Sequence, residues 1–299
     1  MNLTNTQSMS PPVNIQPERF SIKIPEGVMA GWRWRNDQKP PLMFCHATGF
    51  CASAYKQMLG RLSASFDIYA LDMRGHGRTD LPANPRKLKS WRIYARDIAS
   101  FLDQQNREQW TLAGHSMGAV TATMAARGRD DIAAVKLIEP VAMPQLLNFV
   151  AATPVWPLIS SRLSLVQKAA SRRAHWSARS DVVASYSKKA LFREWSAGAL
   201  SDYLEDGLSE TDDGVVLSCT PEWEAATFAA HANNFWGAVA HSPAPIAVFA
   251  ANSTTSTVIE IARTRFLKTG AALKTVDGVS HLAPMEKPGL AADFVASST

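Results

Sequence analysis

The sequence QWTLAGHSMGAVTATMAA occupies residues 109–126 and combines two kinds of local structure. Its first half is short and apolar, which predicts a buried strand, and its second half is rich in Ala and Met, which favours a helix. Gly114, Ser116 and Gly118 stand between the two halves in the pattern Gly-X-Ser-X-Gly. At a strand-to-helix junction this pattern is typical of a sharp turn that presents the serine as a nucleophile. Because the glycines omit Cβ atoms that a tight turn cannot accommodate, we predict that Ser116 projects above the amino end of the helix.

Strand and helix patterns alternate on both sides of this turn. A hairpin is expected from two strands joined by Pro25-Glu26-Gly27, and helical spacing follows Ala52 and Ser90. Such alternation predicts an α/β fold with a mostly parallel sheet and helices on both faces. The remaining apolar runs that favour strands cover residues 20–24, 28–34, 41–45, 66–71, 134–138, 245–251 and 272–276.

The middle of the chain has a different pattern, helical and rich in tryptophan, from residue 144 to residue 242. We interpret this block as an inserted helical cap over the carboxyl ends of the strands. Residues 19–143 and 243–299 then form the core. Residues 1–18 are polar and contain three prolines, which favours a disordered tail.

The composition narrows the functional classes. The chain has 299 residues, of which 46% are hydrophobic and 19% charged, so a large packed core is possible. The net charge of +5 comes with no nucleic-acid-binding motif, and we expect neither nucleic acid nor membrane as a partner. Three cysteines form no disulfide framework, and no signal peptide or transmembrane run is evident, so we expect a cytoplasmic protein. No cofactor and no metal site is predicted.

Four segments carry a resemblance to the α/β-hydrolase family. His46-Ala-Thr-Gly-Phe50 resembles the loop after the family's third strand, and Asp72-Met-Arg-Gly-His-Gly77 resembles its Asp-X-Arg-Gly-X-Gly turn. The segment 114–118 resembles the nucleophile turn, and Gly278-Val-Ser-His281 resembles the segment with the catalytic histidine. All four occur in the family's order. The resemblance implies a central eight-stranded sheet, a cap, and a Ser-His-acid triad with Ser116 as nucleophile and His281 as base.

The position of the acid departs from the usual family pattern. The family most often has an Asp after the seventh strand, but residues 250–256 contain no carboxylate. A subset that includes the haloalkane dehalogenases has its acid at the tip of the sixth strand, where this sequence has Glu139. Neighbouring strands are about 4.8 Å apart, so Ser116 and Glu139 can share one site. We therefore predict Glu139 as the acid, and Asn252 as a neutral substitute is the alternative.

Two backbone N–H groups are needed to stabilise an oxyanion at Ser116. One is expected from Met117, the residue after the nucleophile, and the other from the loop after the third strand. Thr48 matches the family's usual position in that loop, while Ala47 or Phe50 could also supply the donor. Phe50 is in addition predicted to contact the substrate.

The expected activity is hydrolysis of a carboxylic ester of a small to medium, largely apolar molecule through an acyl-enzyme. A lactonase or a carbon–carbon bond hydrolase would use the same triad. A ligand-binding relative without turnover is the alternative from another class, although an intact Ser116 and His281 argue against it.

Overall fold

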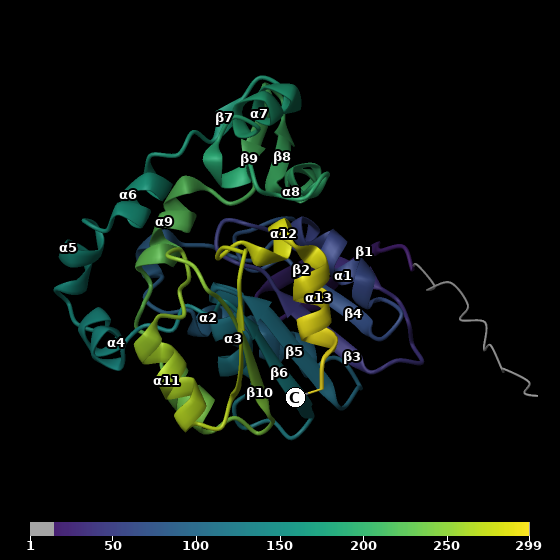
Figure 1. The fold of residues 1–299 in the computed structure, drawn as a ribbon. Coiled ribbons are helices and arrows are strands. Elements are labelled where there is room, and N and C mark those ends of the chain that lie inside the picture. The colour runs from purple at the N-terminus through teal and green to yellow at the C-terminus, as the bar shows by residue number, and fades with distance from the viewer. Residues whose placement is uncertain (1–14, 299) are drawn as a thin grey trace, which may run out of the picture.

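The computed structural model describes residues 15–298 and is built on an eight-stranded sheet. The strand order is β1-β2-β4-β3-β5-β6-β10-β11 (Figure 1). The pairs β1–β2 and β2–β4 are antiparallel and all other pairs are parallel, which confirms the predicted fold class. The strands are β1 (Glu18–Ile24), β2 (Gly27–Trp34), β3 (Pro41–Cys45), β4 (Asp67–Leu71), β5 (Trp110–His115), β6 (Ile132–Ile138), β10 (Ile246–Ala251) and β11 (Ala272–Val276).

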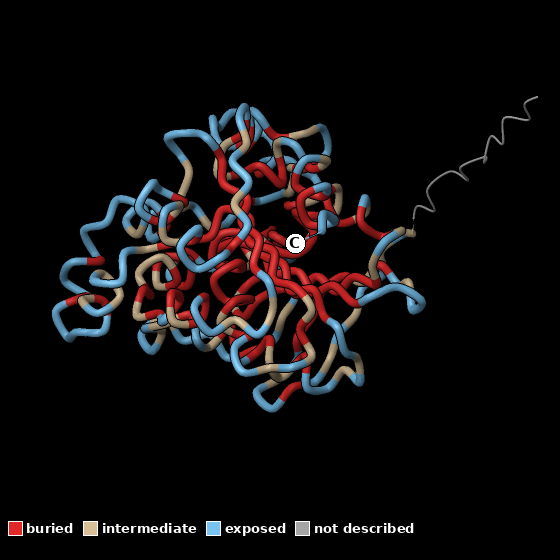
Figure 2. Tube along the Cα trace, turned by 60° about the horizontal axis from the view of Figure 1, so that its bottom comes forward, coloured by how far each residue is buried: buried red, intermediate tan, exposed pale blue. Residues whose placement is uncertain are grey.

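The central strands are buried on both faces, as expected for parallel strands between two helical layers (Figure 2). Alternate residues face opposite layers: Met43 packs in one core cluster, while Leu42 and Phe44 pack in the other. One layer consists of α2 (Arg92–Leu102), α3 (Met117–Ala126), α10 (Phe235–Ala240) and α11 (Glu260–Lys268), and the other of α1 (Lys56–Leu62), α12 (Ala283–Glu286) and α13 (Pro288–Ala296).

The register of the parallel strands brings their carboxyl ends to one edge. Cys45 of β3 pairs with Gly114 of β5, and Ile138 of β6 pairs with His115 on one side and Phe249 on the other. The loops that leave β3, β5, β6 and β10 therefore meet above the same part of the sheet, at the usual location of a binding site in such folds.

The segment between β6 and β10 is mostly helical and also contains a small antiparallel sheet, β7-β9-β8, which the sequence interpretation did not include. A turn at Asp212–Asp213 joins β8 and β9, and Gly214, the first residue of β9, adopts a positive φ of 141°. This segment contains α4 (Gln145–Ala151), α5 (Trp156–Ser160), α6 (Ser164–Ala170), β7 (His175–Trp176), α7 (Arg179–Tyr186), α8 (Ala199–Gly207), β8 (Leu208–Thr211), β9 (Gly214–Leu217) and α9 (Pro221–Ala229).

Two further predictions concern the amino-terminal tail and membrane-spanning segments. Residues 1–14 of the predicted tail lie outside the described residues, and Glu18 already begins β1. In the range 15–298, no helix is both long enough and apolar enough to cross a membrane.

Candidate active site

Ser116 occupies the sharp turn between β5 and α3. Its backbone has φ 57° and ψ −116°, a conformation that L-residues adopt at a cost in free energy. The turn brings α3 so close to β3 that a Cβ on Gly118 would overlap the Cys45 carbonyl, and a Cβ on Gly114 would overlap the backbone of Gly118. The two glycines are therefore required by close backbone approach.

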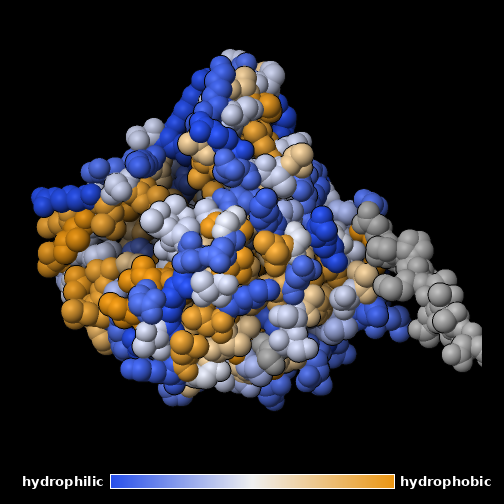
Figure 3. All heavy atoms as spheres, viewed as in Figure 1, coloured by the Kyte–Doolittle hydropathy of each residue, from blue (hydrophilic) through white to orange (hydrophobic). Residues whose placement is uncertain are grey.

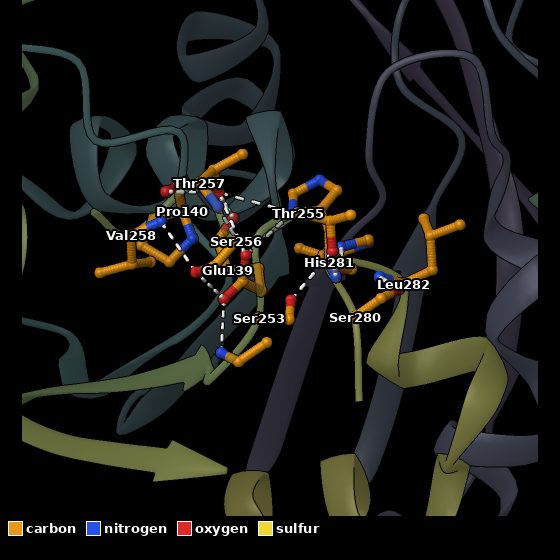
Figure 4. A network of polar contacts seen from close by, with 12 residues as sticks. Glu139, Pro140, Ser253, Thr255, Ser256, Thr257, Val258, Ser280, His281 and Leu282 are labelled. Atoms are coloured by element: carbon orange, nitrogen blue, oxygen red, sulfur yellow. Dashed lines mark hydrogen bonds and ion pairs between the residues drawn. The ribbon is translucent and has the colours of Figure 1, made fainter. Parts of the chain in front are cut away.

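Glu139 follows β6 directly, with a positive φ of 48° and a fully buried side chain. The turn after β10 surrounds its carboxylate (Figure 4). Oε1 accepts hydrogen bonds from the Ala251 N–H at 2.6 Å and the Ser256 hydroxyl at 2.8 Å. Oε2 accepts the Thr257 N–H at 2.8 Å and lies 3.1 Å from Nδ1 of His281. Both carboxylate oxygens are thus held in place.

The environment of Glu139 favours its charged form. Burial by itself raises the pKa of this carboxyl, but the hydrogen bond and charge interaction with His281 act in the opposite direction. The N–H groups of Ala251 and Thr257 add to this effect, and the pKa of Glu139 ends below its ordinary value. The group next to His281 is therefore a carboxylate at neutral pH.

His281 lies in the loop between β11 and α12, where several contacts orient it. Its backbone N–H donates to Thr255 Oγ1 at 3.2 Å, and its ring Nδ1 faces Glu139. A carboxylate at Nδ1 holds the proton there and leaves Nε2 as the basic nitrogen. Within residues 15–298, neither Nε2 nor the Ser116 hydroxyl has a hydrogen-bond partner, and both residues line the same cavity. The hydrogen bond between such a histidine and serine is often long or absent without substrate and shortens only once substrate is bound.

Of the three N–H groups proposed as the second donor in the loop after β3, one is available among the described residues. The Ala47 N–H donates to the Tyr55 hydroxyl at 3.0 Å, and the Phe50 N–H donates to the Ala47 carbonyl at 3.2 Å. The N–H groups of Thr48 and Met117 have no partner among the described residues. The two donors predicted for the oxyanion are therefore unoccupied, whereas the alternatives Ala47 and Phe50 are engaged in the fold.

A chain of hydrogen bonds that sequence reasoning missed joins this loop to the histidine loop. The Ala47 N–H donates to the Tyr55 oxygen, and the Tyr55 hydroxyl lies 2.7 Å from His115 Nδ1. His115 Nε2 lies 2.8 Å from the His281 carbonyl, so it carries the proton and donates. Burial and the nearby His281 hold the pKa of His115 well below its usual value. His115 was visible inside the Gly-X-Ser-X-Gly motif, but nothing in the sequence marks Tyr55.

The predicted alternative to Glu139, Asn252, lies elsewhere. Asn252 donates its side-chain amide to Asp277 at 2.6 Å, away from His281. Glu260 is exposed at the start of α11. The turn between Asn252 and Glu260 contributes Ser256 and Thr257, which donate hydrogen bonds to Glu139. No signal in the sequence distinguished these two residues from other loop residues.

A cavity of about 680 Å³ lies between the sheet edge and the inserted segment. Ser116, His281, Thr48 and Phe50 form part of its wall, so the structure brings these predicted residues to one space. Most of the remaining wall is apolar and includes Trp91, Met143, Leu163, Leu165, Phe192 and Phe228. This volume and lining suit a small to medium molecule.

Apolar side chains also gather on the outer surface of α4–α6 (Figure 3), among them Leu146, Phe149 and Leu158.

The chain belongs to the alpha/beta hydrolase family, whose model matches residues 42–294. It is 32% identical over 93 residues to the 2-(acetamidomethylene)succinate hydrolase of Mesorhizobium japonicum, a match that covers 31% of this chain and 32% of that protein. The matched stretch is thus about a third of the length of that curated relative.

Solved structures agree in fold. An E-2-(acetamidomethylene)succinate hydrolase has a TM-score of 0.74 at 20% identity, covering 92% of this chain and 97% of that one. A thioesterase domain from the curacin biosynthetic pathway has a TM-score of 0.77 at 14% identity, covering 94% of this chain and all of that one. At these identities the likeness shows the fold alone.

Proposed function

We propose that this protein is a serine hydrolase that cleaves a carboxylic ester of a small to medium, largely apolar molecule. One observation carries the proposal. A buried carboxylate, Glu139, orients His281 at the wall of the cavity that also contains Ser116, and the unoccupied N–H groups of Thr48 and Met117 belong to the two loops beside it.

In the first half of the reaction, Nε2 of His281 takes the hydroxyl proton of Ser116 as Oγ attacks the ester carbonyl carbon. The carbonyl electrons move onto oxygen, and the N–H groups of Thr48 and Met117 stabilise the resulting oxyanion. The carboxylate of Glu139 stabilises the imidazolium. The tetrahedral intermediate then breaks the ester C–O bond, and His281 gives its proton to the departing alkoxide.

In the second half, a water molecule attacks the acyl-enzyme. His281 takes one proton from the water, the oxyanion forms again in the same place, and the bond to Ser116 Oγ breaks. Ser116 recovers its proton from His281, and the carboxylic acid leaves. One ester and one water thus become one acid and one alcohol, with the enzyme unchanged.

A fluorophosphonate probe and p-nitrophenyl esters of increasing acyl length test the proposal together. We expect covalent labelling of the wild-type protein at Ser116 and measurable hydrolysis of the short to medium esters. Ser116→Ala should lose both. A wild-type protein that is folded but neither labelled nor active on any ester would refute the proposal and favour a binding protein without turnover.

Lactone opening and carbon–carbon bond hydrolysis need the same groups, so they are the alternative activities. A panel of lactones run beside the esters separates them, because the preferred class should have the higher kcat/KM.

A further inference from the structure

The cavity above Ser116 has an uneven distribution of charge. Three cationic side chains line it: Lys168 from α6, Arg172 from the segment after α6, and Lys189 from the segment after α7. Glu224 is the one carboxylate among the described lining residues. His231 also lines the cavity, but burial lowers its pKa to about 4, so it is neutral at pH 7. The wall therefore carries an excess of two positive charges.

Both terminal nitrogens of Arg172 are engaged within the protein. Its Nη1 donates to both carboxylate oxygens of Glu224, at 3.0 and 2.8 Å. Its Nη2 donates to the hydroxyls of Tyr186 and Tyr203, at 2.9 and 3.0 Å. Tyr203 donates in turn to the Gly49 carbonyl at 3.1 Å, next to Thr48. This network fixes the guanidinium beside the proposed oxyanion loop, and Glu224 balances its charge.

The charge of Lys189 is not balanced by an ion pair within residues 15–298. Its ammonium lies 4.0 Å from the centre of the Tyr186 ring, and the Arg172 guanidinium carbon lies 5.7 Å from the same ring centre. It forms no ion pair with any residue in the described part of the chain, and Lys168 forms none either. Lys189 is an exposed residue, yet desolvation by its neighbours and then repulsion from Arg172 lower the pKa of its ammonium group, while Glu224 acts in the opposite direction. A charge in this position is stabilised by an anion that enters the cavity.

We infer that the substrate carries a carboxylate, and that Lys189, with Lys168 on the same cavity, binds it while the ester carbonyl lies at Ser116. The substrate class is then a half-ester of a dicarboxylic acid or a similar ester with one free carboxylate. This inference rests on the proposed function, since it names the substrate class of the same site. The apolar wall would contact the carbon chain between the two groups.

The test compares two p-nitrophenyl esters of matched length, mono-p-nitrophenyl glutarate and p-nitrophenyl valerate, after subtraction of the uncatalysed rates. We expect the wild-type protein to have the higher kcat/KM for the glutarate ester. Lys189→Met should lower that value about tenfold or more, mainly through KM, and leave the valerate ester within about twofold. Lys188→Met is the matched control, because Lys188 precedes Lys189 in the chain and does not line the cavity; it should change neither.

Equal activity of the wild-type protein on the two esters, or equal effects of Lys189→Met on both, would overturn the inference. A separate binding measurement keeps it distinct from the proposed function. In Ser116→Ala, titration calorimetry should show tighter binding of monomethyl glutarate than of methyl valerate, and Lys189→Met should remove the difference. If no ester is hydrolysed but this difference is present, the proposed function fails and the anion site stands. If esters are hydrolysed and this difference in binding is absent, the proposed function stands and the anion site fails.

Discussion

The two ends of the proposed site differ in how their polar groups are paired. At the acid end, both oxygens of Glu139 accept several hydrogen bonds, from residues 251–257 and His281. At the nucleophile end, the Ser116 hydroxyl and the N–H groups of Thr48 and Met117 have no partner among residues 15–298. Both ends are buried, with Glu139 at 0% and Ser116 at 7% exposure.

Buried polar groups in folded proteins are almost always paired, so the difference has a meaning. A paired group contributes to stability, whereas an unpaired one at a cavity wall indicates where atoms of a ligand bind. Substitutions at the nucleophile end should therefore change turnover without changing stability. Substitutions at the acid end should change both.

The largest effect is expected at the nucleophile. Ser116→Ala and His281→Ala should each lower kcat by about 10⁴- to 10⁶-fold, and the double variant should lose little more, because the two residues act as a unit. The free energy of unfolding of Ser116→Ala should stay within about 0.5 kcal/mol of the wild type, since no hydrogen bond is removed. Steady-state kinetics and urea unfolding measure the two quantities. Nearly full activity in a folded variant would contradict the role assigned to Ser116.

Glu139→Gln should affect activity and stability together. Loss of the charge that stabilises the imidazolium should lower kcat by about 10²- to 10⁴-fold. The new amide group places N–H donors opposite the donors that now surround the carboxylate, which should cost about 1–3 kcal/mol in unfolding free energy. Glu260→Gln is the control, because Glu260 is exposed, and it should change neither quantity. A Glu139→Gln variant with unchanged stability would show that the two ends do not differ as described.

Thr257→Val tests the support behind the carboxylate with a smaller change. The Thr257 hydroxyl donates to the Glu139 carbonyl at 2.8 Å and lies 3.4 Å from both Glu139 Oε2 and His281 Nδ1. Its removal should lower kcat by about three- to tenfold and unfolding free energy by about 1 kcal/mol. Asn252→Ala, at the other end of the same turn, should leave kcat within about twofold, because its amide contacts Asp277. A larger loss of kcat in Asn252→Ala than in Glu139→Gln would show that the acid has been assigned to the wrong strand.

The smallest effect concerns the pH dependence of stability. The pKa of Glu139 is lower in the folded protein than its ordinary value of 4.5, so the folded state favours the carboxylate. Its contribution is fully present above that value and is lost as the pH falls from there through the folded-state pKa. Unfolding free energy in this acid range should therefore fall less steeply for Glu139→Gln than for the wild type. Parallel curves for the two proteins would show that Glu139 gains no stabilisation from its partners.

The sequence by itself determined the class of fold, and it predicted which residues along the chain form the site. Alternating strand and helix patterns predicted the sheet, because backbone periodicity is a local property. The glycines around Ser116 predicted the turn, because the steric demand is local as well. Glu139 could be proposed as the acid because it directly follows a predicted strand and residues 250–256 lack a carboxylate.

Only the tertiary structure decided which groups meet. Glu139 and His281 are 142 positions apart in the chain, and Tyr55 and His115 are 60 apart. Thr48 is distinguished from Ala47 and Phe50 only by hydrogen bonds that occupy its neighbours. Lys189 reaches the same cavity as Ser116 through the folding of the inserted segment. Such pairings depend on packing between elements distant in sequence, and no local pattern of residues encodes them.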